Sequence, residues 1–119
     1  MLKNITKLAY RYHEVKDVAE FNNLIKTIKT PYVLDFYAGW CGPCKMLWPI
    51  ISKVEQENAG KWTIIKLDID QEGLAEIVEN HQVSGVPTLA FYKGNQKVYQ
   101  RAGFADDKAF KDLVNKYLI

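Results

Sequence analysis

The two cysteines of this 119-residue chain, Cys41 and Cys44, are separated by two residues. Thiols at this spacing could brace the fold as a disulfide, bind a metal ion or exchange with other disulfides. A disulfide that closes so short a loop removes little entropy from the unfolded chain, so it would brace the fold poorly. Zinc normally takes four ligands, and His13 and His81 lie far from the pair in sequence. The pair therefore favours redox chemistry, and we expect no metal site.

The cysteine pair stands in the sequence WCGPCK at residues 40–45, between an apolar run of strand length and a helical pattern. A thiolate at a helix N-terminus meets unpaired backbone N–H groups and the positive end of the helix dipole, which stabilise it. We therefore expect Cys41 to be the exposed nucleophile and Cys44, one turn inside the helix, to be less accessible. Pro43 can occupy the first helical turn without losing a hydrogen bond, and it helps to hold the sulfur atoms at bonding distance.

The elements that must position this pair follow from hydrophobic periodicity. Helices are expected at residues 17–28, 46–54, 72–80 and around 110–118, and strands at residues 10–15, 32–38, 62–67, 88–92 and 97–102. Asp17 with Glu20 resembles a capping box at the first helix. The run 32–38 is mostly apolar, which is typical of a strand buried on both faces. The order β-α-β-α-β-α-β-β-α predicts an α/β fold with a mixed sheet flanked by helices on both faces.

Composition and charge exclude several classes of function. With 48% hydrophobic and 25% charged residues, the chain has the composition of a globular domain, and its length suits a single core. A net charge of +2, spread among acids, is too small to indicate nucleic-acid binding. No apolar run approaches the roughly 18 residues of a membrane-spanning helix. We expect one soluble domain that binds neither nucleic acid nor membrane.

Several motifs together resemble those of the thioredoxin family, and the resemblance extends from about residue 12 to residue 119. The sequence VLDFYA at 33–38 followed by WCGPCK matches the family's active-site strand and loop, and KLDID at 66–70 resembles its third strand. VSGVPTL at 83–89 resembles the loop whose proline is cis and faces the cysteines, and Pro49, Gly94 and Gly103 match further family positions. The resemblance implies the thioredoxin fold.

The resemblance also assigns roles to individual residues. Asp35 lies between apolar neighbours, so we expect it to be buried, with a raised pKa that suits proton transfer at the cysteines. Lys66 is either a solvated strand lysine or, as the resemblance implies, the lysine near that aspartate. Residues implied to support the site or to dock substrates are Trp40, Gly42, Pro43, Val86, Pro87 and Gly103. Tyr37 stands where bacterial members often carry Trp, and Trp48 where a smaller residue is usual, so these two positions bear on partner preference.

The function implied is that of a protein-disulfide reductase. Cys41 attacks a substrate disulfide and Cys44 resolves the mixed disulfide. The redox pair itself carries the electrons without a further cofactor, and a thioredoxin reductase supplies them. One alternative is an interaction subunit of a larger protein complex with an idle redox pair, because fold alone does not determine function. Another is an isomerase-like oxidant, although Gly-Pro between the cysteines resembles the reducing members.

The first dozen residues exceed what a minimal thioredoxin needs, so we divide the chain into an extension, 1–12, and a thioredoxin domain, 13–119. Lys3, Lys7 and Arg11 recur every four residues, apolar residues lie between them, and the first acidic residue is Glu14. This composition is typical of a mitochondrial presequence. The alternative is a short basic extension on a cytoplasmic protein.

Overall fold

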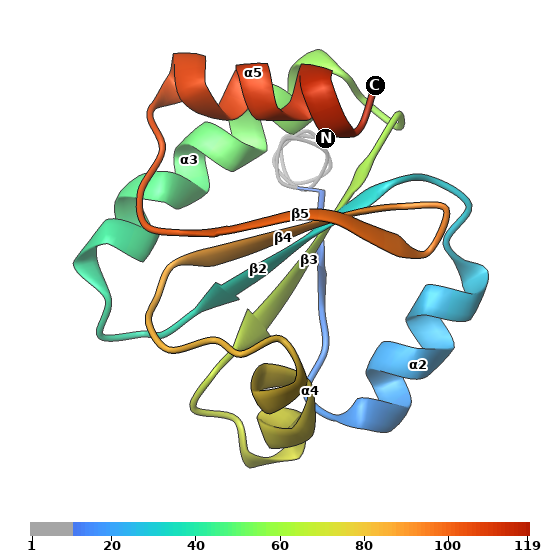
Figure 1. The fold of residues 1–119 in the computed structure, drawn as a ribbon, viewed down its shortest axis with the longest axis vertical. Coiled ribbons are helices and arrows are strands. Elements are labelled where there is room, and N and C mark those ends of the chain that lie inside the picture. Colours follow the sequence, from blue (N-terminus) through green and yellow to red (C-terminus); the bar gives the residue numbers. More distant parts are fainter. Residues whose placement is uncertain (1–10) are drawn as a thin grey trace, which may run out of the picture.

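The computed structural model describes residues 11–119, so most of the predicted extension lies outside the described residues. The strands are β1 (His13–Glu14), β2 (Tyr32–Tyr37), β3 (Thr63–Asp68), β4 (Thr88–Lys93) and β5 (Gln96–Ala102). The helices are α2 (Val18–Thr27), α3 (Gly42–Glu57), α4 (Ala75–Asn80), which the short 3₁₀ helix η1 (Glu72–Leu74) precedes, and α5 (Asp107–Tyr117). The predicted order of elements is confirmed, and Figure 1 shows it from blue to red.

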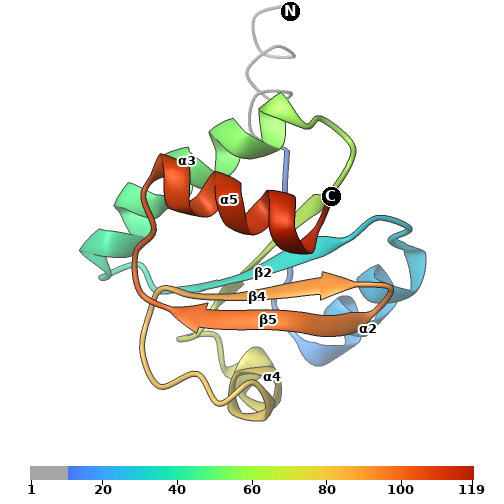
Figure 2. The ribbon, with the colours of Figure 1, turned by 45° about the horizontal axis from the view of Figure 1, so that its top comes forward.

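The strands form one mixed sheet in the order β1-β3-β2-β4-β5. β3 pairs in parallel with β1 and β2, whereas β4 pairs antiparallel with β2 and β5. Helices α3 and α5 cover one face of this sheet, and α2 and α4 cover the other, as Figure 2 shows in side view. The predicted fold class is therefore confirmed.

Strand β2 lies at the centre of the sheet and is buried on both faces, as its apolar run predicted. Val33 packs into the core cluster beneath α3 and α5, whereas Leu34 and Phe36 pack into the cluster on the side of α2 and α4. Because side chains alternate along a strand, Asp35 points to the same face as Val33, toward α3. The buried carboxyl thus lies on the side of the sheet that carries the cysteine helix.

Some local expectations differ from the structure. Helix α3 runs over Gly42–Glu57, longer than the predicted 46–54, because Pro43 is tolerated in its first turn and Cys41 provides its N-cap. At α2, Asp17 accepts a hydrogen bond from the Glu20 backbone N–H at 2.8 Å, as the capping box predicted. The Glu20 carboxylate, however, accepts from the Lys16 N–H and not from that of Asp17, so the box is reciprocal only in part.

The first strand is shorter than predicted, and only His13–Glu14 form it. The two residues before it still contact the domain: Arg11 forms an ion pair of 3.2 Å with Glu55, and the Tyr12 ring packs edge-on against Trp48. Within residues 11–119, no helix has the length and apolar character that crossing a membrane requires.

Candidate active site

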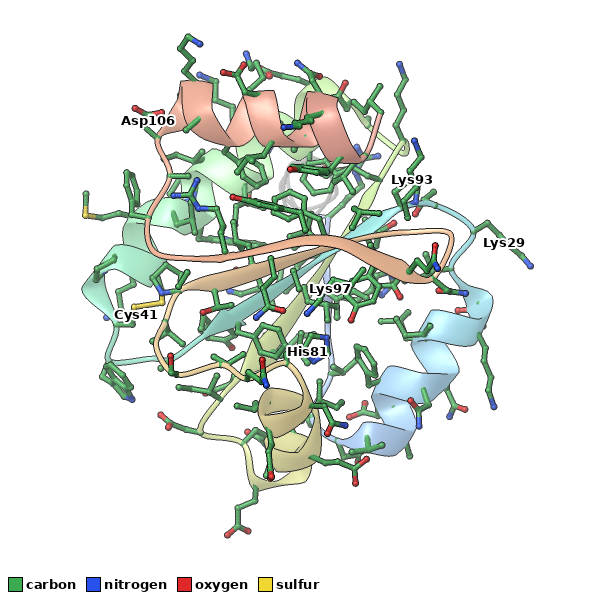
Figure 3. All side chains as sticks on the ribbon, in the orientation of Figure 1. Lys29, Cys41, His81, Lys93, Lys97 and Asp106 are labelled. Atoms are coloured by element: carbon green, nitrogen blue, oxygen red, sulfur yellow. A yellow bond between two sulfur atoms is a disulfide. The ribbon has the colours of Figure 1, made fainter. Side chains whose placement is uncertain are left out.

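The two cysteines form a disulfide where the carboxyl end of β2 leads into the first turn of α3, with their Cα atoms 5.3 Å apart. Figure 3 shows this bond beside the Cys41 label, at the start of the helix. Among residues 11–119, no three His, Cys, Asp or Glu side chains are grouped as metal ligands would be. The disulfide at the start of α3 can exchange with other thiols and disulfides.

Cys41 is the N-cap of α3. Its Sγ accepts a hydrogen bond from the Cys44 backbone N–H at 3.1 Å, which satisfies one of the donors left free at the helix start. Pro43 lies in the first turn, as expected. When the disulfide is reduced, the same N–H and the helix dipole stabilise negative charge on the Cys41 sulfur.

The expected difference in exposure between the cysteines is wrong for the oxidised protein. Cys41 is 3% exposed and Cys44 is 7% exposed, so both sulfurs are covered. They pack into one small cluster with Ala38, against which Ile69 and Val86 also lie. Because this covering residue Val86 comes from a loop far along the chain, the motif alone could not reveal it.

Asp35 is buried, 3% exposed, as its apolar neighbours predicted. Burial raises its pKa to about 7, while the positive charge of Lys66 lowers the pKa and the negative charge of Glu14 raises it further. A pocket of about 310 Å³ is lined by Asp35 and Cys44 together, and also by Lys66 and Trp48. The carboxyl and the inner cysteine thus share one small space.

Lys66 is not a solvated strand lysine. It is the register partner of Asp35 across the β2–β3 pair and of Glu14 across the β1–β3 pair. Its Nζ lies 4.4 Å from the centre of the Tyr37 ring and 4.1 Å from that of Trp48. The structure therefore brings Lys66 beside Asp35, as the resemblance implied.

Glu14 belongs to the site, and sequence reasoning missed it. The Tyr37 hydroxyl donates a hydrogen bond to Glu14 Oε2. Burial raises the pKa of Tyr37, and the hydrogen bond to Glu14 raises it further. Tyr37 follows Asp35 by two residues on the same face of β2. In the sequence, Glu14 stands out only as the first acidic residue of the chain. Its position beside Lys66 follows from the register of β1 on β3, which the sequence does not show.

The loop before β4 closes the site from the other side. The Val86–Pro87 peptide is cis, which agrees with the family resemblance. The Pro87 carbonyl accepts a hydrogen bond from the Gly103 N–H at 2.8 Å, and Gly103 has a φ of 98°, a region that favours glycine. Val86 packs against the cysteine cluster, and the hydrogen bond joins its neighbour Pro87 to Gly103.

Trp40 and Gly42 lie on the outer side of the motif. Trp40 is 69% exposed, and its Nε1 donates a hydrogen bond of 2.8 Å to Asp70. Gly42 is exposed, and a Cβ at this position would meet no atom within 4 Å, so packing does not require glycine there. Both residues thus present exposed surface next to the buried disulfide.

Comparison with known proteins gives one consistent answer. A family model described as Thioredoxin matches residues 12–116. The thioredoxin of Mycoplasmoides gallisepticum is 37% identical over 84% of this chain and 96% of its own length, and that of Bacillus subtilis is 39% identical over 71% and 79%. The crystal structure of oxidised thioredoxin O2 from Arabidopsis thaliana superimposes with a TM-score of 0.79, at 32% identity over 92% of this chain and 96% of that one.

These matches agree with what the geometry shows independently. The disulfide caps a helix at the end of a central buried strand, with a buried carboxyl beneath it and a cis-proline loop opposite. The chain belongs to the thioredoxin family, and it is a dithiol–disulfide oxidoreductase.

Proposed function

We propose that the protein works as a protein-disulfide reductase in which Cys41 is the nucleophile and Cys44 is the resolving thiol. The observation that carries this proposal is the hydrogen bond from the Cys44 N–H to Cys41 Sγ at the helix N-cap. That position stabilises a thiolate on Cys41 and offers nothing equivalent to Cys44. The assignment rests on this bond, since the two sulfurs are similarly buried.

The reaction proceeds in two exchanges. The Cys41 thiolate attacks one sulfur of a substrate disulfide, and the other substrate sulfur leaves as a thiolate that takes up a proton. The Cys44 sulfur, once deprotonated, attacks Cys41 Sγ and releases the second substrate thiol. Two electrons pass from the protein dithiol to the substrate, and the Cys41–Cys44 disulfide re-forms.

Family membership also supports a proposal for the partners. It implies a thioredoxin reductase as the electron donor and disulfide-containing proteins as substrates, with the electrons carried on the redox disulfide and no further cofactor. We assign substrate docking to Trp40 and to the loop of Val86 and Pro87, with Gly103 as its support. Exposed apolar surface at Trp40 and a covering side chain at Val86 support this assignment.

We assign to Asp35 the role of proton acceptor for Cys44, with Lys66 beside it as the nearby positive charge. Cys44 must lose its proton before it attacks the mixed disulfide, but burial disfavours its thiolate. Asp35 lines the same pocket, and its pKa of about 7 allows it to take up a proton near neutral pH. A direct transfer or one through a single water molecule fits this arrangement.

We also propose a mitochondrial location, directed by the basic extension at residues 1–12. The composition of that segment supports it, as does the similarity to the mitochondrial thioredoxin of Bos taurus, 31% identical over 95% of this chain.

We expect the full chain to catalyse insulin reduction by NADPH in the presence of a thioredoxin reductase. Cys41→Ser should abolish turnover, because it removes the attacking thiolate. Asn22→Ala, at an exposed position of α2 outside the proposed machinery, is the control and should retain turnover. Absence of turnover with several reductases, while the disulfide remains reducible by dithiothreitol, would support the idle-subunit alternative.

In the reduced protein, Cys41 should react with iodoacetamide much faster than Cys44 near neutral pH, because only Cys41 has the N-cap stabilisation. Peptide mass spectrometry after short exposure measures both rates in one sample. Denatured protein is the control, and there the two rates should converge. Equal rates in the folded protein would contradict the assignment of the nucleophile.

Asp35→Asn should slow release of the mixed disulfide by roughly 10- to 100-fold, because it preserves the shape of the side chain but removes the base. The first attack by Cys41 should change less. Single-turnover reduction with acid quench, repeated across pH, separates the two steps. The wild-type resolution rate should rise with pH through about 7 as Asp35 ionises, and this rise should be lost in the variant. An unchanged resolution step in the Asn variant would leave Asp35 a purely structural role.

Residues 1–12 fused to a fluorescent protein should direct it to mitochondria in eukaryotic cells, because a basic amphipathic segment is what import recognises. Replacing Lys3, Lys7 and Arg11 by Gln in the fusion should abolish import. A wild-type fusion that remains cytosolic would overturn the proposed location.

A further inference from the structure

The Lys66 ammonium is surrounded by three aromatic rings from three parts of the chain. Its Nζ lies 4.1 Å from the ring centre of Trp48 on α3, 4.4 Å from that of Tyr37 on β2 and 5.5 Å from that of Tyr12, which precedes β1. All three distances are within the range of cation–π attraction. We call Tyr12, Tyr37 and Trp48 the aromatic enclosure.

The rings of the aromatic enclosure support one another. The Tyr12 ring packs edge-on against Trp48, with ring centres 5.0 Å apart and planes at 83°. The hydroxyl of Tyr37 is held by its hydrogen bond to Glu14 Oε2. The Tyr12 and Tyr37 rings are thus held by contacts of their own, and Lys66 lies within cation–π distance of all three rings.

No ion pair within 4.0 Å joins Lys66 to a carboxylate in the described part of the chain. Its register partners Asp35 and Glu14 are both acidic, yet the ammonium lies over the ring faces of Tyr37 and Trp48. Lys66 and Trp48 line the same pocket as Asp35 and Cys44. A positive charge within the reach of three rings thus lies in the same pocket as the carboxyl.

We propose that the aromatic enclosure holds the Lys66 ammonium beside Asp35, and that its three rings are positioning residues for proton transfer at that carboxyl. Without ring faces around it, the flexible lysine side chain would extend into water, where ammonium is well hydrated. Asp35 would then lose the nearby charge that favours its ionised form. This inference rests on the proposed role of Asp35 as the proton acceptor.

Several other groups face Asp35 and must be accounted for. Glu14 approaches from β1 and Tyr37 from β2 itself, and Cys44 and Lys45 of α3 line the shared pocket. Across β4, Arg101 of β5 lies in the same register row, through Leu89. In the oxidised protein the cysteines carry no titratable proton. A titration of Asp35 in that state therefore reports on the carboxyl without interference from Cys44.

Replacing Trp48 by Leu has two effects of opposite sign on Asp35. Release of Lys66 removes a positive charge and raises the midpoint of the Asp35 titration. Wider access of water to the pocket reduces desolvation and lowers that midpoint. The direction of the shift therefore distinguishes a positioning role of the ring from a role as a mere cover.

The test is a carboxyl-carbon NMR titration of Asp35 in the oxidised full chain. We expect Trp48→Leu to raise the midpoint by about half a pH unit to one unit, and Trp48→Phe, which keeps a ring face, to give less than half of that shift. Lys66→Met should raise the midpoint as well, and adding Trp48→Leu to it should produce no further rise. Tyr12→Leu, at a residue 43% exposed, should give a smaller upward shift and serves if the Trp48 variant does not fold.

An unchanged or lowered midpoint in both Trp48→Leu and Tyr12→Leu would overturn the proposal. So would a full shift from Trp48→Leu in the Lys66→Met background, because the ring would then act without the lysine. The pH profile of mixed-disulfide resolution, measured on the same variants, tests the proposed function separately. If the NMR midpoint moves and the rate profile does not, the enclosure is supported and the role of Asp35 as the base is overturned.

Discussion

Burial of β2 on both faces and pairing along both edges is the constraint on which the rest of the site depends. β3 and β4 hold the strand in register, and the two core clusters hold it from above and below. The carboxyl end of β2 is therefore fixed in the sheet, and a short turn connects it to Cys41 and α3. Because the strand cannot shift, the N-cap sulfur, the helix dipole and the buried carboxyl keep a constant relation to one another.

The same burial creates a conflict at Asp35. A carboxyl on the core face of a central strand is disfavoured in its ionised form, which is why its pKa rises to about 7. Lys66 on the neighbouring strand β3 lowers the Asp35 pKa and so offsets part of this rise, whereas Glu14 on β1 raises the pKa further. Two charged neighbours in the same register row, Lys66 and Glu14, thus adjust the proton affinity of a carboxyl that an apolar core would otherwise keep neutral.

Helix α3 carries both Cys44 of the redox pair and Trp48, which contacts Lys66 of that register row. One turn after Cys44, it places Trp48 over Lys66, and farther along it places Glu55 against Arg11. The segment before β1 is thereby joined to the cysteine helix at two points, through Tyr12 and Arg11. The residues at the start of the described chain contribute to the environment of the site and are more than a connection to it.

The sequence by itself determined the order of the elements, the mixed sheet, the redox pair and the burial of Asp35, because these depend on periodicity and on immediate neighbours in the chain. It did not determine the covered state of Cys41, whose cluster includes Ile69 and Val86 from distant parts of the chain. Nor did it reveal Glu14 or the aromatic enclosure around Lys66. Those contacts arise from the parallel register of β1 and β2 on β3, which joins residues far apart in sequence. A local sequence pattern does not specify the register between distant strands, so only the tertiary structure could reveal these contacts.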